Sequence, residues 1–439
     1  MKYIFRLLFF ALVFYHIFPQ GLSVFGSSFI FASGVIGLGL FVYERAPVPE
    51  TKKIFAAYLP ITFMCLLTFL INNLYYDPFW WDSVKTIFGY YFSAYLIIMI
   101  FNKLHPNGSI QTIVIYIVAA IIAQGIISIL MDRIPVVNSF FEDLMLMDEL
   151  TKFKRLETKG ERLLGYGIAF FGAGIIYGFG LILLIFILMT KKTNQLGRIF
   201  LAICYAFIFY VGLLSARTTM IGGGASLVLL ILLFVKGKQV KISTEQLILF
   251  FVIIIVILGI GQTLCYLYYR DFYDWAFEAF TNYKESGELR TDSSDGLSNM
   301  WAFPQTVQGW IFGDGHMLFR GTDIGFSRLL LYIGIPGTLA YFYFQYVVMK
   351  TTFTQYKSLN YTVTVLFLYN LFLNVKGLAD INTVTFIIFF YVMYHKYYIV
   401  IPERQKVIAM QRKEEYYRQK ERKEELVETE RKGPILEKK

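Results

Sequence analysis

The sequence predicts an all-α protein that crosses a membrane many times. Of its 439 residues, 56% are apolar and only 16% are charged, whereas soluble domains carry about 25% charged residues. The apolar residues form runs of membrane length, since about 20 residues cross roughly 30 Å of hydrocarbon. Two long polar segments, at about residues 132–162 and 269–322, interrupt these runs. We therefore expect about 12 transmembrane helices and two large loops.

The chain divides into a membrane domain and a tail. Residues 1–400 hold the spans, and residues 401–439 interleave basic and acidic side chains, which is typical of a solvated helix or a disordered segment. Clusters of glycine in two spans predict close helix packing through small faces. The spans are expected at residues 3–18, 22–43, 54–74, 84–101, 110–131, 163–190, 198–214, 219–235, 245–268, 324–348, 359–375 and 381–400.

Basic residues in the short loops predict the orientation in the membrane. An even number of spans puts both termini on one side. The short loops on that side carry twelve basic residues, against three on the other, so the positive-inside rule places both termini in the cytoplasm and the two long loops outside it. The twelve are Arg45, Lys52, Lys53, Lys103, Lys191, Lys192, Arg198, Lys236, Lys238, Lys241, Lys350 and Lys357; the three are Lys85, Arg217 and Lys376.

Several functional classes are not indicated. The net charge of +10 is explained by basic topology anchors, so we expect no nucleic-acid partner. The three cysteines lie in apolar spans, the four histidines are scattered, and no grouping has the spacing of metal ligands. The chain also lacks the glycine-rich loops that cradle nucleotide phosphates. We expect neither a metal nor a cofactor.

Arg217 is the first candidate for chemistry. It stands in the short connection of "VGLLSARTTMIGGG" between two spans, where a buried arginine is costly and usually has an anionic partner. Its guanidinium group matches two phosphate oxygens at once. The alternative is an arginine that only anchors the interface. Ser215, Thr218 and Thr219 are expected to cap the next helix, whose N-terminus favours an anion.

Each long loop ends in further candidates. The first loop ends in the basic run "FKRLETKGERLLGYG", a pattern most often found on a solvated face, but Arg162 directly abuts a span. The second ends in "IFGDGHMLFRGTDIGFSRLLLYIGIPG", in which the glycines indicate tight turns. Asp323 and Arg328 stand at the mouth of the next span, and Asp323 fits a helix cap as well as a catalytic role. His316 and Asp314 are nearby ionisable alternatives.

Lys376 and Asp380 lie at the ends of the last two spans, in the stretch "NVKGLADIN". The simple interpretation is a salt bridge that closes the hairpin. The sharper one is that Lys376 contacts the same anion as Arg217.

These residues resemble the bacterial O-antigen and capsular repeat-unit polymerases (Wzy-type), in the O-antigen ligase and polymerase superfamily. The similarity lies in Arg162 before a glycine-rich span, in Ser215-x-Arg217 at the start of a span, in the "FGDG" turn, and in the polar residue before "GFSRLLLYIGIPG". It covers most of residues 1–400. The chain departs from the family where an arginine often stands four residues before a loop tryptophan. Leu297 holds that place before Trp301, and Arg290 is the candidate replacement.

The resemblance implies a membrane fold of the GT-C kind and a metal-independent, inverting glycosyl transfer. The substrate would be an undecaprenyl-pyrophosphate-linked oligosaccharide, polymerised on the outer face of the bacterial cytoplasmic membrane into O-antigen, capsule or exopolysaccharide. Further partners would be membrane lipid, a flippase and a chain-length regulator. In this scheme Asp323 is the base, with His316 in reserve, and the residues that bind pyrophosphate are Arg217, Arg162, Arg290 and Arg328.

Two other functions remain open from the sequence. An O-antigen ligase would have a similar layout, but ligases often carry a histidine where this chain has Asp323. A flippase or transporter of lipid-linked oligosaccharides would also have about a dozen spans. Charge should then line the middle of several spans, and here the span centres are almost free of charge.

Overall fold

The computed structural model describes residues 2–24, 27–72, 79–147, 149–158, 162–168, 170–236, 242–288, 290–315, 321–379 and 382–402, and five further residues of the tail. The chain divides into two compact units, Met1–Phe390 and Tyr391–Lys439. All contacts considered below lie within the first unit.

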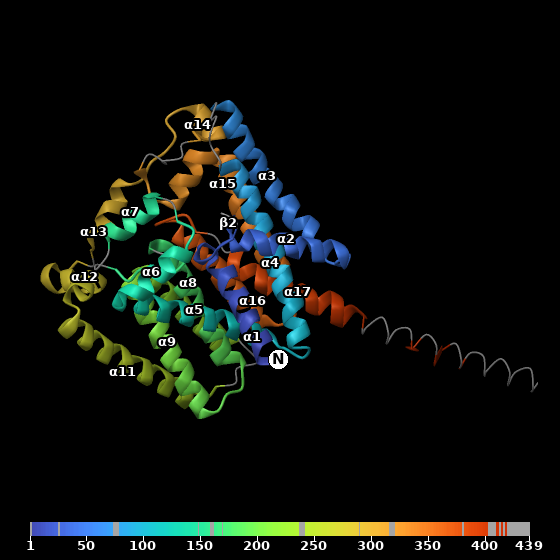
Figure 1. The fold of residues 1–439 in the computed structure, drawn as a ribbon, viewed down its shortest axis with the longest axis horizontal. Coiled ribbons are helices and arrows are strands. Elements are labelled where there is room, and N and C mark those ends of the chain that lie inside the picture. Colours follow the sequence, from blue (N-terminus) through green and yellow to red (C-terminus); the bar gives the residue numbers. More distant parts are fainter. Residues whose placement is uncertain are drawn as a thin grey trace, which may run out of the picture. The chain divides into compact units, whose positions relative to one another are not determined.

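The described part of the chain is almost entirely helical (Figure 1). Its strands, β1 (Ser23–Val24) and β2 (Ser27–Ser28), form a small antiparallel pair. Among the described residues, eight helical stretches are long and apolar enough to cross a membrane, so the protein is an all-α, multi-pass membrane protein. They lie in α3 (Glu50–Ile71), α4 (Phe79–Leu104), α5 (Ile110–Arg133), α8 (Phe170–Thr190), α9 (Gln195–Ser215), α10 (Thr219–Lys236), α11 (Thr244–Tyr268), and α17 (Asn382–Tyr394) with the π-helix η3 (His395–Val400).

Helices also form at the other four expected spans. They are α1 (Lys2–Ile17), α2 (Phe29–Tyr43), α15 (Gly325–Thr351) and α16 (Lys357–Leu373). The first two are apolar but shorter than a full membrane crossing, so the count of about 12 spans stays a prediction. Two expected starts were wrong. α2 begins only at Phe29, and residues 163–168 are not helical although their composition is apolar.

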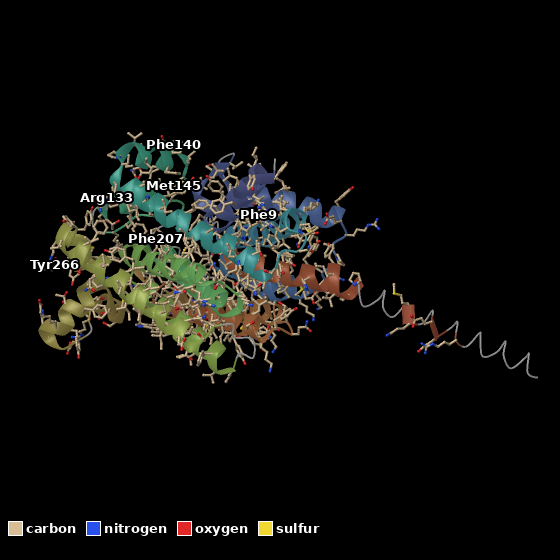
Figure 2. All side chains as sticks on the ribbon, turned by 90° about the horizontal axis from the view of Figure 1, so that it is seen from below. Phe9, Arg133, Phe140, Met145, Phe207 and Tyr266 are labelled. Carbon is tan, nitrogen blue, oxygen red and sulfur yellow. The ribbon has the colours of Figure 1, made fainter. Side chains whose placement is uncertain are left out.

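Helix α8 forms the centre of the bundle because glycines let its neighbours approach closely. A Cβ on Gly222 of α10 would lie 2.3 Å from Cα of Gly178 on α8, so only glycine fits there. On another interface, a Cβ on Gly125 of α5 would lie 2.9 Å from the ring of Phe207 on α9 (Figure 2). These contacts agree with the small-face packing expected from the sequence. By contrast, α11 is largely exposed.

The two long loops are helical over much of their length. The first holds α6 (Pro135–Leu144) and α7 (Glu149–Glu157), and the second holds α12 (Arg270–Ser286), α13 (Asp292–Asn299) and α14 (Val307–Phe312). Both leave the same end of the bundle, because the guanidinium group of Arg133, at the end of α5, lies 4.0 Å from the ring centroid of Tyr269, just after α11. We call this end the loop end.

Helix α15 is bent where the second loop meets it. Gly334 has φ 65° and ψ −172° inside the helix, and Pro336 follows. The bend interrupts the helical hydrogen bonds, and the carbonyl of Leu331 accepts instead from the backbone N–H of Asp314, at 2.7 Å. Gly313, at φ 79°, packs so closely on the bend that a Cβ would collide with the carbonyl of Tyr332. The predicted turn at "FGDG" is thereby confirmed and explained.

Candidate functional site

A buried, non-helical segment brings two predicted arginines together at the loop end. Residues 162–168 run between the helices, and the backbone N–H of Leu163 donates to the carbonyl of Leu214 at 3.0 Å. Leu214 lies in the last turn of α9, three residues before Arg217. This bond therefore sets Arg162 beside the connection between α9 and α10 that carries Arg217.

Both guanidinium groups lie on one tryptophan of the second loop. The guanidinium carbon of Arg162 is 4.9 Å from the ring centroid of Trp275 on α12, and that of Arg217 is 4.7 Å away. Cations at such distances are attracted to the negative ring face, which also offsets part of their mutual repulsion. Trp275 thus contacts both positive charges.

Glu278, one helical turn after Trp275, supplies the counter-charge. Its carboxylate lies 2.6 Å from Nη1 of Arg217, and the two side chains are only 18% and 11% exposed. Nε of Arg217 is buried and makes no hydrogen bond. Arg217 is therefore not a solvated interfacial anchor, and it retains donor capacity for an anion beyond Glu278.

Lys376, in the turn after α16, adds a third cation. Burial lowers its pKa, and the charges of Arg217 and Arg162 lower the pKa further, while Asp323 acts in the opposite direction. Lys376 is thus within electrostatic reach of both arginines and of Asp323. Asp380, its expected salt-bridge partner, lies outside the described residues.

Asp323 lies at the edge of this cluster. Its side chain is 64% exposed and forms an ion pair with Arg328, whose Nε also donates to the carbonyl of Thr322 at 2.8 Å. Ile324, not Asp323, is the N-cap of α15, and no side chain makes a capping hydrogen bond there. The helix-cap interpretation of Asp323 was therefore wrong. The reserve base, His316, lies outside the described residues.

The expected caps before α10 were also wrong. The hydroxyl of Ser215 donates back to the carbonyl of Val211 in α9, at 3.0 Å. The hydroxyl oxygens of Thr218 and Thr219 are buried without a hydrogen-bond partner. None of the three hydroxyls therefore caps α10. The side-chain amide of Gln124 on α5 is also buried without a hydrogen-bond partner.

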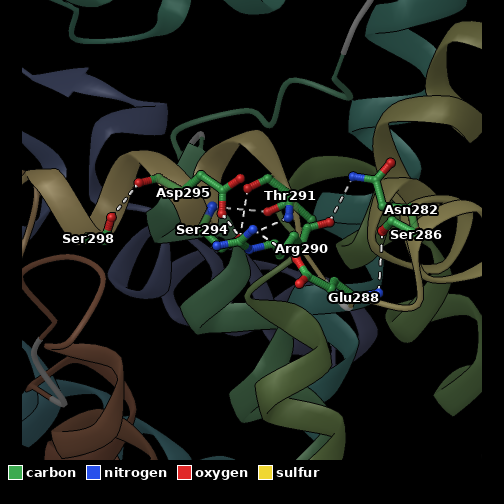
Figure 3. Close-up of polar contacts among 8 residues, drawn as sticks. All are labelled: Asn282, Ser286, Glu288, Arg290, Thr291, Ser294, Asp295 and Ser298. Atoms are coloured by element: carbon green, nitrogen blue, oxygen red, sulfur yellow. Dashed lines mark hydrogen bonds and ion pairs between the residues drawn. The ribbon is translucent and has the colours of Figure 1, made fainter.

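Arg290 lies in a separate network (Figure 3). Its side chain is 63% exposed and pairs with Glu288 at 2.8 Å and Asp295 at 3.6 Å, and its carbonyl accepts from Asn282 at 2.9 Å. These contacts join α12 to the start of α13. These contacts involve neither Trp275 nor Glu278, so they place Arg290 in a different network from Arg162 and Arg217.

Arg155 holds the segment that carries Arg162. It lies buried on α7, and its Nη1 donates to the carbonyl of Gly165 at 2.9 Å. Burial lowers the pKa of Arg155, with Glu142 acting in the opposite direction. Gly167 of the same segment donates its N–H to Sδ of Met145, at 3.1 Å. One arginine of the basic run therefore supports the site from inside the protein, while Lys152 is exposed.

Trp275 and Glu278 were missed in the sequence. The available signal was their spacing of three residues within "RDFYDWAFEAF", which puts an aromatic ring and an acid on one face of an amphipathic helix. Within the described residues, no group of three His, Cys, Asp or Glu residues could hold a metal. The arrangement can bind a multiply charged anion next to an apolar bundle.

No family model, no curated protein and no solved structure matches this chain.

Proposed function

We propose that the chain is a glycosyltransferase that polymerises lipid-linked oligosaccharide repeat units on the outer face of the bacterial cytoplasmic membrane. The observation that supports this most is the proximity of Arg162, Arg217 and Lys376 at the loop end of an apolar helix bundle. A lipid diphosphate suits such a place, because its oxygens match the cations and its tail matches the bundle. The product would be O-antigen, capsule or exopolysaccharide.

In the proposed reaction, a hydroxyl of the acceptor sugar attacks the anomeric carbon of the donor. The bond between that carbon and the diphosphate oxygen breaks, and the diphosphate leaves with the electron pair. Its negative charge grows during this step, and fixed guanidinium groups stabilise the growing charge. The hydroxyl proton passes to a carboxylate. The linkage to diphosphate supplies the free energy, so no nucleotide is required.

The two carboxylates receive different roles because inversion places acceptor and leaving group on opposite faces of the anomeric carbon. Glu278 contacts Arg217 and is therefore on the side of the leaving group. Asp323 pairs with Arg328, and its negative charge acts on Lys376, which also feels the charges of Arg217 and Arg162. We assign Asp323 as the base, and Glu278 as the internal anion that the diphosphate displaces from Arg217.

The first prediction concerns elongation by the purified full-length protein in lipid vesicles. The substrate is the lipid-linked repeat unit extracted from a strain that lacks this protein, and polymer is resolved on a gel. We expect Arg217→Ala to lower the elongation rate by about 10²–10³-fold, the usual cost of removing one charge-stabilising donor. Asp323→Asn should lower it to a similar extent, because the amide cannot accept the proton.

The matched control is Arg270→Ala, since Arg270 is an exposed arginine of α12 that pairs with Asp274 at 2.9 Å, outside the cluster. It should elongate like the wild type. Wild-type protein that moves the lipid between leaflets without elongating it would refute the polymerase in favour of a flippase. Transfer of finished polymer to a second lipid, without elongation, would refute it in favour of a ligase.

A further inference from the structure

Three aromatic rings of the second long loop form a row. The ring centroids of Trp301 and Phe303 are 6.0 Å apart with planes inclined by 20°, and those of Phe303 and Trp310 are 5.9 Å apart with planes inclined by 14°. Aromatic pairs prefer offset-stacked or edge-to-face arrangements, and the small angles between these ring planes fit offset stacking. Trp301 and Phe303 are both 44% exposed. We call these three residues the aromatic row.

The backbone explains why the rings align. Residues 301–304 are not helical, and in extended chain residues two apart point to the same side, as Trp301 and Phe303 do. Pro304 turns inward and is buried, and α14 then brings Trp310 to the other side of Phe303. The row is therefore built by the fold of the loop.

The row leads to the proposed base. The backbone N–H of Ala302, between the first two rings, donates to the hydroxyl of Ser327 at 3.4 Å. Ser327 adjoins Arg328, which pairs with Asp323. The first two rings therefore lie by the start of α15, next to the segment that carries the carboxylate assigned to the acceptor hydroxyl.

The chemistry of the row fits a pyranose chain. The axial C–H groups of a pyranose form an apolar, weakly positive face that packs on the negative face of an aromatic ring. The exposed amides of Gln305 and Gln308 beside the row supply donors and acceptors for hydroxyl groups. Charged side chains are absent from residues 301–312, which suits a ligand rich in hydroxyl groups.

We infer that Trp301, Phe303 and Trp310 form a binding site for the acceptor saccharide, separate from the diphosphate site at Arg162, Arg217 and Lys376. The inference rests on the proposed polymerase. It adds that the protein grips the sugar chain over more than one residue before transfer, so that long acceptors bind more tightly than short ones.

The second prediction tests this site by direct binding. The probe is the polysaccharide of the host organism, released from its lipid by mild acid, and the protein is the full chain in lipid nanodiscs. We expect the double variant Trp301→Ala, Phe303→Ala to bind about tenfold more weakly, because two ring contacts are lost. Trp301→Phe should bind like the wild type, and so should Val307→Ala, which removes a side chain that is 77% exposed nearby but adds nothing to the row.

Elongation assays separate this inference from the proposed function. In the double variant the first transfer should persist with a raised KM for the acceptor and a nearly unchanged kcat, while products become shorter. Arg217→Ala should still bind the polysaccharide, although it does not elongate. If the wild-type protein binds the polysaccharide but does not elongate it, the proposed polymerase function is refuted and the inferred saccharide-binding site is retained.

Two results would overturn the inference. One is a double variant that binds the polysaccharide as the wild type does. The other concerns tryptophan fluorescence in vesicles that contain lipids brominated near the headgroup. If these lipids quench the fluorescence of the wild type and the quenching disappears in Trp301→Phe, Trp301 lies in the bilayer, where tryptophan commonly anchors membrane proteins.

Discussion

At the residue scale, the candidate site centres on one tryptophan, Trp275, that contacts two arginines. Arg162 and Arg217 could be identified from the sequence, because an arginine against an apolar span is costly and needs a reason. Their partners could not, since Trp275 and Glu278 lie on a helix in what the composition indicates only as a polar loop. Arg290 is the opposite case, a residue that the motif suggested for the site. Its contacts with Glu288 and Asp295 place it in another network.

The third prediction concerns Lys376 and pH. Burial and the neighbouring arginines lower the pKa of Lys376, so it loses its charge at a lower pH than an ordinary lysine does. The affinity of the site for inorganic pyrophosphate should therefore fall as the pH rises through that lowered pKa, by about tenfold for one charged contact. Binding to the purified protein, measured as a function of pH, checks this.

Lys376→Arg is the control, because arginine stays charged throughout the range. The probe itself titrates, but equally with both proteins, so the difference between the two curves reports Lys376. Identical curves for the wild type and Lys376→Arg would mean that Lys376 does not contribute to anion binding.

At the scale of the elements, hydropathy predicted the locations of the helices more accurately than their first residues. Each expected span coincides with a helix, because apolar runs of this length leave the backbone little choice but internal hydrogen bonds. The exception, residues 163–168, is equally apolar. Its backbone bonds instead to Arg155, Met145 and Leu214, and such partners are distant in the sequence.

The fourth prediction uses neighbouring glycines of α10 that differ in surroundings. A Cβ on Gly222 would lie 2.3 Å from the backbone of Gly178, whereas a Cβ on Gly224 meets nothing within 4 Å. Gly222→Ala should therefore destabilise the protein by about 1–3 kcal/mol, as overpacked sites do. Gly224→Ala should be neutral or slightly stabilising, because it only lowers backbone freedom. Thermal unfolding in detergent measures both, and equal melting temperatures would contradict the close packing of α8 on α10.

At the scale of the whole molecule, the fold class was predictable and the orientation in the membrane remains a prediction. The all-α, multi-pass architecture follows from composition and run length, and eight helical stretches in the part of the chain that the structure describes meet the requirement for spanning. Which end faces the cytoplasm rests on the distribution of lysine and arginine in the short loops. That signal acts during insertion and leaves no mark on the folded coordinates.

The fifth prediction tests the orientation by labelling. Cys65, Cys204 and Cys265 are buried, so single exposed cysteines can be read in a background where these three are replaced by serine or alanine. In intact cells, a maleimide that cannot cross the membrane should label Gln308→Cys in the second loop but not Lys192→Cys between α8 and α9. Permeabilised cells should label both. Labelling of Lys192→Cys alone in intact cells would invert the assigned topology.

The bend in α15 has a consequence for exchanging parts of this protein. The carbonyl of Leu331, released by the break at Gly334, is satisfied by the N–H of Asp314. A carbonyl left bare in a membrane span costs several kcal/mol, so the segment around Asp314 completes the hydrogen bonding of a helix that is expected to span the membrane and that comes later in the chain. A chimera that imports a foreign second loop would have to import the first half of α15 with it. The natural graft boundary is therefore beyond Pro336, and not at the apparent edge of the membrane.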